Sequence, residues 1–96
     1  MGIVRLRPAA DRDLQIIYRY SVKEWGNDRA ERYIRDLSTA FQKLANNELK
    51  STCADDLRAG LHSCRVVSHI VFFKQTDDGI LVIRVLHKSM DYLKHL

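Results

Sequence analysis

Residues 69–87 read HIVFFKQTDDGILVIRVLH, and this stretch decides the fold of the chain. Its two runs at residues 70–73 and 80–83 are apolar at successive positions, which indicates central strands covered on both faces. Between the runs, Asp78-Gly79 predicts a two-residue hairpin turn with positive φ at both positions. Because so short a turn joins neighbouring strands in opposite directions, we expect an antiparallel pair.

The segments around these strands extend the sheet. Residues 61–67 have the character of a third strand, joined to the first run through a turn at Ser68. Residues 3–7, IVRLR, alternate apolar and basic side chains, as a half-buried strand does. Residues 47–57 are polar and irregular, so a loop is expected there. Residues 89–95 are compatible with a short C-terminal helix.

Apolar residues recur at helical spacing between the first predicted strand and residue 46. Pro8 suits the first turn of a helix, where its missing N–H would be unpaired anyway, and Gly26 is typical of a helix end. Asp28 with Glu31 predicts an acidic capping box at the start of a second helix, which Asn46-Asn47 ends. Two helices joined by so short a turn form an antiparallel hairpin.

The predicted fold class is therefore α+β, with the order β-αα-βββ. An antiparallel helical hairpin packs on an antiparallel four-stranded sheet. One hairpin covers only one face of a sheet, so the other face should be partly open or covered by the C-terminal segment.

Length and charge restrict the function classes. The chain has 96 residues, enough for a single domain over residues 1–96, which excludes a multidomain enzyme. The net charge of +4 favours acidic partners, and residues 57–76 contain basic but no acidic side chains. The N-terminus reaches a charged residue at once and no run approaches the ~20 apolar residues of a membrane span, so we expect a cytoplasmic protein that contacts no membrane. Cys53 and Cys64 then stay reduced, and neither a metal nor a cofactor is expected.

Arg84 is a charge among apolar neighbours on a central strand. Regular alternation places Ile80, Val82, Arg84 and Leu86 on one face. A buried guanidinium needs a partner, and the nearest acidic residue in sequence is Asp91. Two interpretations follow: a structural ion pair that holds the C-terminal segment, or an anion-binding group at the base of a cleft.

His69 and His87 lie at the ends of adjacent predicted strands, where each is either a structural residue or a general acid or base. The sequence has no Ser-His-Asp order, no paired carboxylates on one face and no glycine-rich phosphate loop. No catalytic residue is therefore predicted.

Two strings, SHIVFF at residues 68–73 and IRVLHKSMD at residues 83–91, resemble the sheet and C-terminus of ParE toxins. These toxins belong to the ParE/RelE superfamily of bacterial type II toxin–antitoxin systems. Arg58, Gly60 and Leu61 also match the Arg-x-Gly-Leu region of the family, and the resemblance runs nearly end to end. It implies a β-αα-βββ fold and a toxin neutralised by a ParD-like antitoxin, whose helix lies along the helical hairpin.

The resemblance further implies inhibition of DNA gyrase by binding, with DNA contacted only through the antitoxin complex. The residues expected to form the gyrase-binding surface are Arg58, Arg65, Arg84, His87, Lys88, Met90, Asp91 and Tyr92. Those expected to bind the antitoxin are Tyr18, Val22, Trp25, Tyr33 and Phe41.

Two alternatives remain open. RelE relatives cleave messenger RNA on the ribosome, and in that case Arg58, Arg65 and Arg84 would grip phosphate while His87 or Tyr92 moves the proton. The second alternative is a degenerate toxin that acts only through antitoxin binding.

Overall fold

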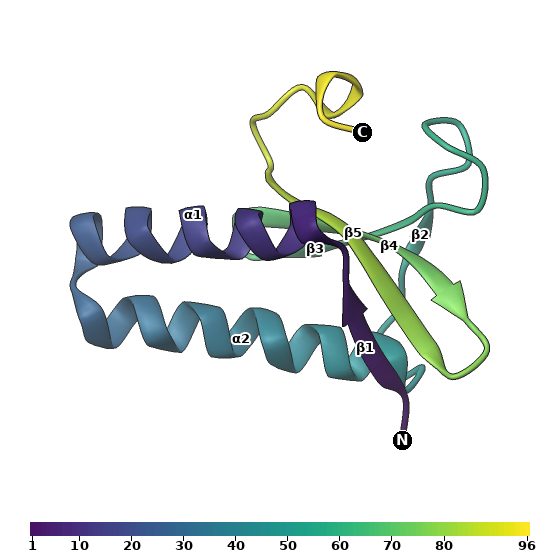
Figure 1. The fold of residues 1–96 in the computed structure, drawn as a ribbon, viewed down its shortest axis with the longest axis horizontal. Helices are drawn as coiled ribbons and strands as arrows, with labels where there is room; N and C mark the ends of the chain where they lie inside the picture. Colours follow the sequence, from purple (N-terminus) through teal and green to yellow (C-terminus); the bar gives the residue numbers. More distant parts are fainter.

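Two antiparallel helices pack on one face of a five-stranded sheet in the computed structural model, which describes residues 1–96 (Figure 1). The strands are β1 (Ile3–Leu6), β2 (Thr52–Cys53), β3 (His62–Val66), β4 (His69–Thr76) and β5 (Gly79–His87). The helices are α1 (Pro8–Trp25) and α2 (Asn27–Ala45), and a short 3-10 helix, η1 (Tyr92–Lys94), follows the sheet. The predicted α+β architecture is confirmed, with the strand order β1-β5-β4-β3-β2.

The sheet differs from the prediction in two respects. First, β1 runs parallel to β5, with Leu6 opposite Val82, so only the other strand pairs are antiparallel. The helical hairpin returns the chain after β1, so no tight turn constrains the direction of that pair. Second, β2 adds a fifth strand inside the predicted loop, where Thr52 and Cys53 pair with β3. Two residues are too few to show an alternating pattern.

Gly26 serves both helices. Its φ of 88° lies in the left-handed region that glycine adopts without a Cβ penalty. Its N–H donates to the carbonyl of Val22 at 2.9 Å, and its carbonyl accepts the first bond of α2 from Ala30 at 3.1 Å. Helix α2 begins at Asn27, directly after Gly26, so Gly26 and not Asp28 is the N-cap residue. The predicted capping box of Asp28 and Glu31 is therefore wrong, and no side chain caps the helix.

The two hairpin turns of the sheet also differ from expectation. In the β4–β5 turn, Thr76 is opposite Gly79, and neither Asp78 nor Gly79 has a positive φ. Gly79 is needed for another reason, since a Cβ there would collide with the backbone of Ile3. The positive φ occurs instead in the β3–β4 turn, at Val67, with a value of 54°.

A bulge in β5 changes which side chains share a face. Phe72 is opposite Arg84, whereas Phe73 is opposite Val82, so Ile83 has no partner in β4. The extra residue resets the alternation. Val82 and Val85 therefore both face the helices, and the predicted grouping of Val82 with Arg84 on one face is wrong.

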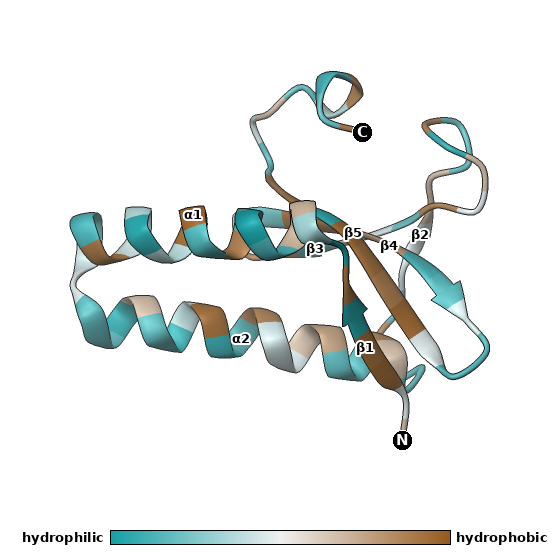
Figure 2. Ribbon diagram, viewed as in Figure 1, coloured by the Kyte–Doolittle hydropathy of each residue, from teal (hydrophilic) through white to brown (hydrophobic).

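Each face of the sheet carries an apolar core. The larger core lies under the helices and contains Ala10, Ile17, Leu37, Phe41, Leu44, Ala45, Cys64, Val71, Phe73, Ile80, Val82 and Val85. The smaller core on the other face contains Ala54, Leu61, Phe72, Ile83 and Leu86. Figure 2 shows apolar residues along β5, between the two cores, and alternating polar and apolar residues along both helices. Tyr92 and Leu96 pack on the smaller core, which confirms that the C-terminal segment covers that face.

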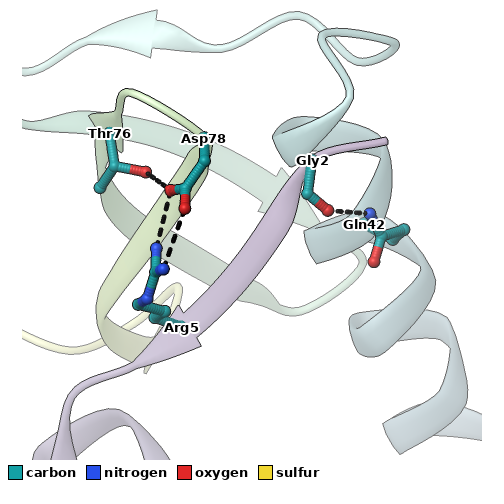
Figure 3. A network of polar contacts seen from close by, with 5 residues as sticks. All are labelled: Gly2, Arg5, Gln42, Thr76 and Asp78. Carbon is teal, nitrogen blue, oxygen red and sulfur yellow. Dashed lines mark hydrogen bonds and ion pairs between the residues drawn. The ribbon is translucent and has the colours of Figure 1, made fainter.

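Polar contacts at the start of β1 fix the sheet edge. The Arg5 guanidinium donates to both carboxylate oxygens of Asp78, at 2.7 and 2.9 Å, and Thr76 donates to the same carboxylate at 3.1 Å (Figure 3). These bonds, chiefly the one from Arg5, lower the pKa of Asp78 to about 2. On the helix side, the Gln42 amide donates to the carbonyl of Gly2 at 2.7 Å. The strand is thus tied to α2 and to the β4–β5 turn.

Candidate functional site

An ion pair between the first helix and the last strand lies at the centre of the candidate site. The carboxylate of Asp13 on α1 accepts two bonds from Arg84, from Nε at 2.8 Å and from Nη2 at 2.9 Å. The same carboxylate accepts the backbone N–H of Val85 at 2.9 Å. Since β1 pairs with β5 only as far as Val82, the next residues of β5 have a free edge, and α1 fills it.

The predicted partner of Arg84 was Asp91, and this prediction is wrong. The Asp91 side chain instead accepts the backbone N–H of Leu93 at 3.2 Å and starts η1. Asp13 is the partner of Arg84 instead. Because Asp13 is only 8% exposed, little water competes with the bidentate pair. Its bonds raise the pKa of Arg84 above the already high ordinary value, so the guanidinium stays charged.

Arg84 also holds the C-terminal strap, the name used here for residues 91–96. Its Nη1 donates to the carbonyl of His95 at 2.7 Å, and Arg58 donates to the carbonyl of Leu96 at 3.4 Å. The Tyr92 ring meets the Phe72 ring edge-on, with centroids 5.2 Å apart. The ion pair of Arg84 therefore ties β5 to α1, and only its Nη1 bond reaches the C-terminal segment.

The two strand-end histidines lie together beside the helical hairpin. His69 is opposite His87 in the β4–β5 register, and their ring centroids are 5.3 Å apart. The Tyr33 hydroxyl is 2.6 Å from Nδ1 of His69 and accepts the backbone N–H of Ser68 at 3.3 Å. Burial, with His87 as the second cause, lowers the pKa of His69 to about 4. His69 is therefore neutral at neutral pH and acts as a hydrogen-bonding partner of Tyr33.

His87 is the last residue of β5 and bonds to the chain that follows it. Its Nδ1 lies 2.7 Å from the Ser89 hydroxyl and accepts the backbone N–H of the same serine at 3.2 Å. These bonds shape the turn that leaves β5. Lys88 and Met90, in that turn, are exposed. The predicted gyrase-binding residues that follow the sheet therefore form one segment, whose last two residues, Asp91 and Tyr92, belong to the strap.

The register places the other predicted arginines relative to this segment. Arg65 is opposite Ile70, which is opposite Leu86, so Arg65 lies on the face of the smaller core. Lys74, opposite Leu81, lies on the same face. Arg65 donates from Nε to the carbonyl of Val67 at 3.0 Å. All three predicted arginines are thus on or beside one sheet face, and each guanidinium already binds an oxygen of the protein.

The residues expected to bind an antitoxin do not form one surface. Tyr18 lines a groove of about 300 Å³ on the helical hairpin with Leu14, Gln15, Arg19 and Ile34. Val22 follows Tyr18 by one helical turn and is half-buried.

The other three expected residues lie elsewhere. Trp25 is exposed near the hairpin tip and contacts Tyr33, with ring centroids 6.2 Å apart. Tyr33 in turn faces His69 of the sheet. Phe41 is 3% exposed and belongs to the larger core, so it is not available for docking.

Sequence reasoning missed two structural partners: Asp13, which pairs with Arg84, and Tyr33, whose hydroxyl bonds to His69. Arg84 was the useful signal, because a buried arginine requires a carboxylate partner somewhere in the chain. No three His, Cys, Asp or Glu side chains lie close enough to hold a metal ion. Neither helix is long and apolar enough to cross a bilayer.

Comparison with known proteins gives a consistent result. The family model described as "ParE toxin of type II toxin-antitoxin system, parDE" matches residues 4–92. The chain is 36% identical over 92 residues to Toxin ParE1 of Mycobacterium tuberculosis (strain H37Rv), covering 95% of this chain and 94% of the relative. It is 36% identical to Toxin ParE1 of Caulobacter vibrioides over 92 residues, covering 96% and 95% of the two chains. Toxin ParE of Escherichia coli is 33% identical over 92 residues, covering 95% and 89%.

Solved structures support the fold. A chain of the chromosomal ParDE system from P. aeruginosa superposes with a TM-score of 0.75 at 18% identity, covering 91% of this chain and 96% of that chain. A chain of the YoeB-YefM complex from Staphylococcus aureus gives 0.59 at 15% identity, covering 91% and 97%. The YafQ mutant H87Q from E. coli gives 0.63 at 14% identity, covering 93% and 96%.

Proposed function

This chain belongs to the ParE toxin family of type II toxin–antitoxin systems, and on that premise we propose that it inhibits DNA gyrase by binding and that a ParD-like antitoxin neutralises it. In this proposal the complex forms in the cytoplasm, and the toxin contacts DNA only through the antitoxin. The target-binding surface is the segment of residues 87–92 with the basic side chains of the adjoining sheet face.

The state of the arginines supports binding over catalysis. Phosphate cleavage needs uncommitted positive charge where negative charge develops, together with a proton donor for the leaving oxygen. Arg84 is instead neutralised by Asp13, and Arg58 and Arg65 donate to backbone carbonyls. The pKa of His69, about 4, keeps its imidazole neutral at neutral pH, so it is a poor general acid. This commitment of Arg84 to Asp13 is the observation that carries the proposal.

A supercoiling assay with purified gyrase tests the target. We expect the toxin to inhibit supercoiling, and we expect Lys88→Ala with Met90→Ala to lose most of the inhibition because both side chains are exposed in the segment. Lys23→Ala, exposed in the last turn of α1, is the matched control that should inhibit like the parent. Absence of inhibition at a large molar excess would refute the gyrase target.

The two alternatives are outcomes of parallel assays. Cleavage of messenger RNA on programmed ribosomes, lost in Arg65→Ala, would replace the proposal with a ribonuclease. Tight antitoxin binding without growth arrest when the toxin is expressed alone would identify a degenerate toxin.

For the antitoxin we propose the helical-hairpin groove lined by Leu14, Tyr18 and Ile34. Its apolar side chains sit beside the exposed Arg19 on α1, so the groove fits a helix with an apolar stripe and an acidic flank. Tyr18→Ala should weaken antitoxin binding about tenfold in a calorimetric titration, as the loss of an aromatic anchor does. Ile16→Ala is the control, since Ile16 is exposed on the same helix but does not line the groove. Equal losses for the two variants would contradict this placement.

A further inference from the structure

The register of the sheet brings two histidine side chains together where β4 begins and β5 ends. His69 is directly opposite His87. At the next position outward, the N–H of Lys88 donates to the carbonyl of Ser68 at 2.9 Å. The histidines therefore form a non-hydrogen-bonded pair, the kind in which opposite side chains are closest. They lie on the helix side of the sheet, where α2 supplies Tyr33, and not on the face that the strap covers.

In each ring the protein binds Nδ1 and leaves Nε2 free. The Tyr33 hydroxyl is 2.6 Å from Nδ1 of His69, and the Ser89 hydroxyl is 2.7 Å from Nδ1 of His87. Neither Nε2 has a hydrogen-bond partner in the protein, and no buried side-chain nitrogen lacks one, so solvent reaches both Nε2 atoms. An imidazole with one nitrogen anchored and the other open is the arrangement found in metal-binding histidines.

The separation of the two rings fits one ion held between them. An imidazole nitrogen binds Zn²⁺ at ~2.0–2.1 Å, which places the metal about 3.2 Å from the ring centre. Two imidazoles on one tetrahedral ion then have ring centres about 5 Å apart. The centroids of His69 and His87 are 5.3 Å apart, with the ring planes at 89°. The pair is thus spaced for chelation without a movement of the strands.

The groups around the rings can also hold the proton that metal binding requires. A neutral imidazole that binds through Nε2 carries its proton on Nδ1. Tyr33 can accept that proton from His69, because its own O–H can donate to the carbonyl of Val66, 3.5 Å away. The Ser89 hydroxyl can accept it from His87, and the exposed Ser89 N–H then binds water. His69 is already neutral at neutral pH, so its ring needs to lose no proton.

We propose that Nε2 of His69 and Nε2 of His87 bind one divalent transition-metal ion, with Zn²⁺ as the reference case and water at the remaining positions. Imidazole ligands suit Zn²⁺, Cu²⁺ and Ni²⁺, whereas Mg²⁺ and Ca²⁺ take oxygen ligands. Permanent structural zinc sites have four protein ligands, so a site with two is a reversible clip on the ends of β4 and β5. This inference is independent of the gyrase target.

Calorimetric titration of Zn²⁺ into the full chain, purified without an affinity tag, tests the site. We expect one equivalent to bind. His69→Gln and His87→Gln should each weaken binding by more than about tenfold, since each removes one of the two ligands, and Tyr33→Phe should weaken it about tenfold through loss of the Nδ1 acceptor. Absence of binding at millimolar Zn²⁺, or equal affinity in His69→Gln, would overturn the proposal.

The chain offers a matched control at the other end of the sheet. His62 is half-buried like His69 and lies opposite the exposed Cys53, whose thiol donates to Asp55 at 3.1 Å. A thiol beside an imidazole and a carboxylate is the competing location for Zn²⁺. Cys53→Ser and His62→Gln should bind the ion like the parent. Loss of binding in either variant would place the ion there and refute the histidine clip.

Imidazole nitrogen NMR on the unmodified chain keeps the test decisive if a variant fails to fold. Zn²⁺ should shift the Nε2 resonances of His69 and His87 and leave those of His62 and His95 in place. The same ion should raise the melting temperature of the parent, because it binds only the folded pair. Shifts confined to His62 or His95, or an unmoved His69, would show that the proposed pair holds no metal.

Discussion

At the scale of single residues, Asp13 has two structural roles. It neutralises Arg84 and also satisfies the N–H of Val85, which no strand reaches. Asp13→Ala should lower the free energy of unfolding by about 3 kcal/mol, because it leaves a charge and a buried donor without partners. Urea denaturation measures this loss. Asp11→Ala, exposed on the same helix, should change stability by less than ~0.5 kcal/mol. Similar losses for both variants would disprove the assigned role.

His69 gives the fold a pH dependence at the same scale. Burial and His87 lower its pKa to about 4, below the ordinary 6.5, while Asp13 opposes the shift and Tyr33 binds Nδ1. The unfolded chain therefore takes up the proton first, so stability is complete above pH 6.5 and falls as the pH drops toward 4. The loss is about 3 kcal/mol at most. Thermal melts across this range should show the decline, and His69→Gln should flatten it. An unchanged slope in His69→Gln would assign the decline to other groups.

At the scale of elements, the β3–β4 turn stores strain. Val67 has a φ of 54°, which is costly for a β-branched residue, and it is 64% exposed, so packing does not compensate. Val67→Asn should raise the free energy of unfolding by about 1 kcal/mol, because asparagine tolerates the left-handed region. Val66→Asn, at the neighbouring half-buried position with ordinary φ, should destabilise the protein. Melting temperatures that fall for both variants would contradict the strain.

Element types could be read from the sequence because they depend on local spacing. The apolar stripes of the helices and the double apolar runs of β4 and β5 are signals within one segment. The bulge at Ile83 could not be predicted, since it depends on the register between two strands. The same applies to the parallel pairing of β1 with β5 and to Asp13 with Arg84, which are 71 positions apart. Among site residues, those in the segment after β5 were found by resemblance, whereas their structural partners lie on distant elements.

At the scale of the whole molecule, Phe72 and Phe73 separate the contributions of the two cores. Phe73 packs under two helices, and Phe73→Ala should cost about 4 kcal/mol because rigid helices cannot close the cavity. Phe72 lies under Tyr92 of the strap, which can settle into the vacated space, so Phe72→Ala should cost about 2 kcal/mol. Urea denaturation of the two variants compares the faces directly. A larger loss for Phe72→Ala would mean that the strap is as rigid as the hairpin.

The pairing of β1 with β5 also determines when the fold can be completed. Helices α1 and α2 and the β3–β4–β5 meander are built from contacts close in sequence, and such contacts form early and fast. The edge strand β1 and the Asp13 carboxylate must wait for β5. Until β5 has emerged from the ribosome, β1 therefore remains an unpaired strand and the larger core lacks Val82 and Val85.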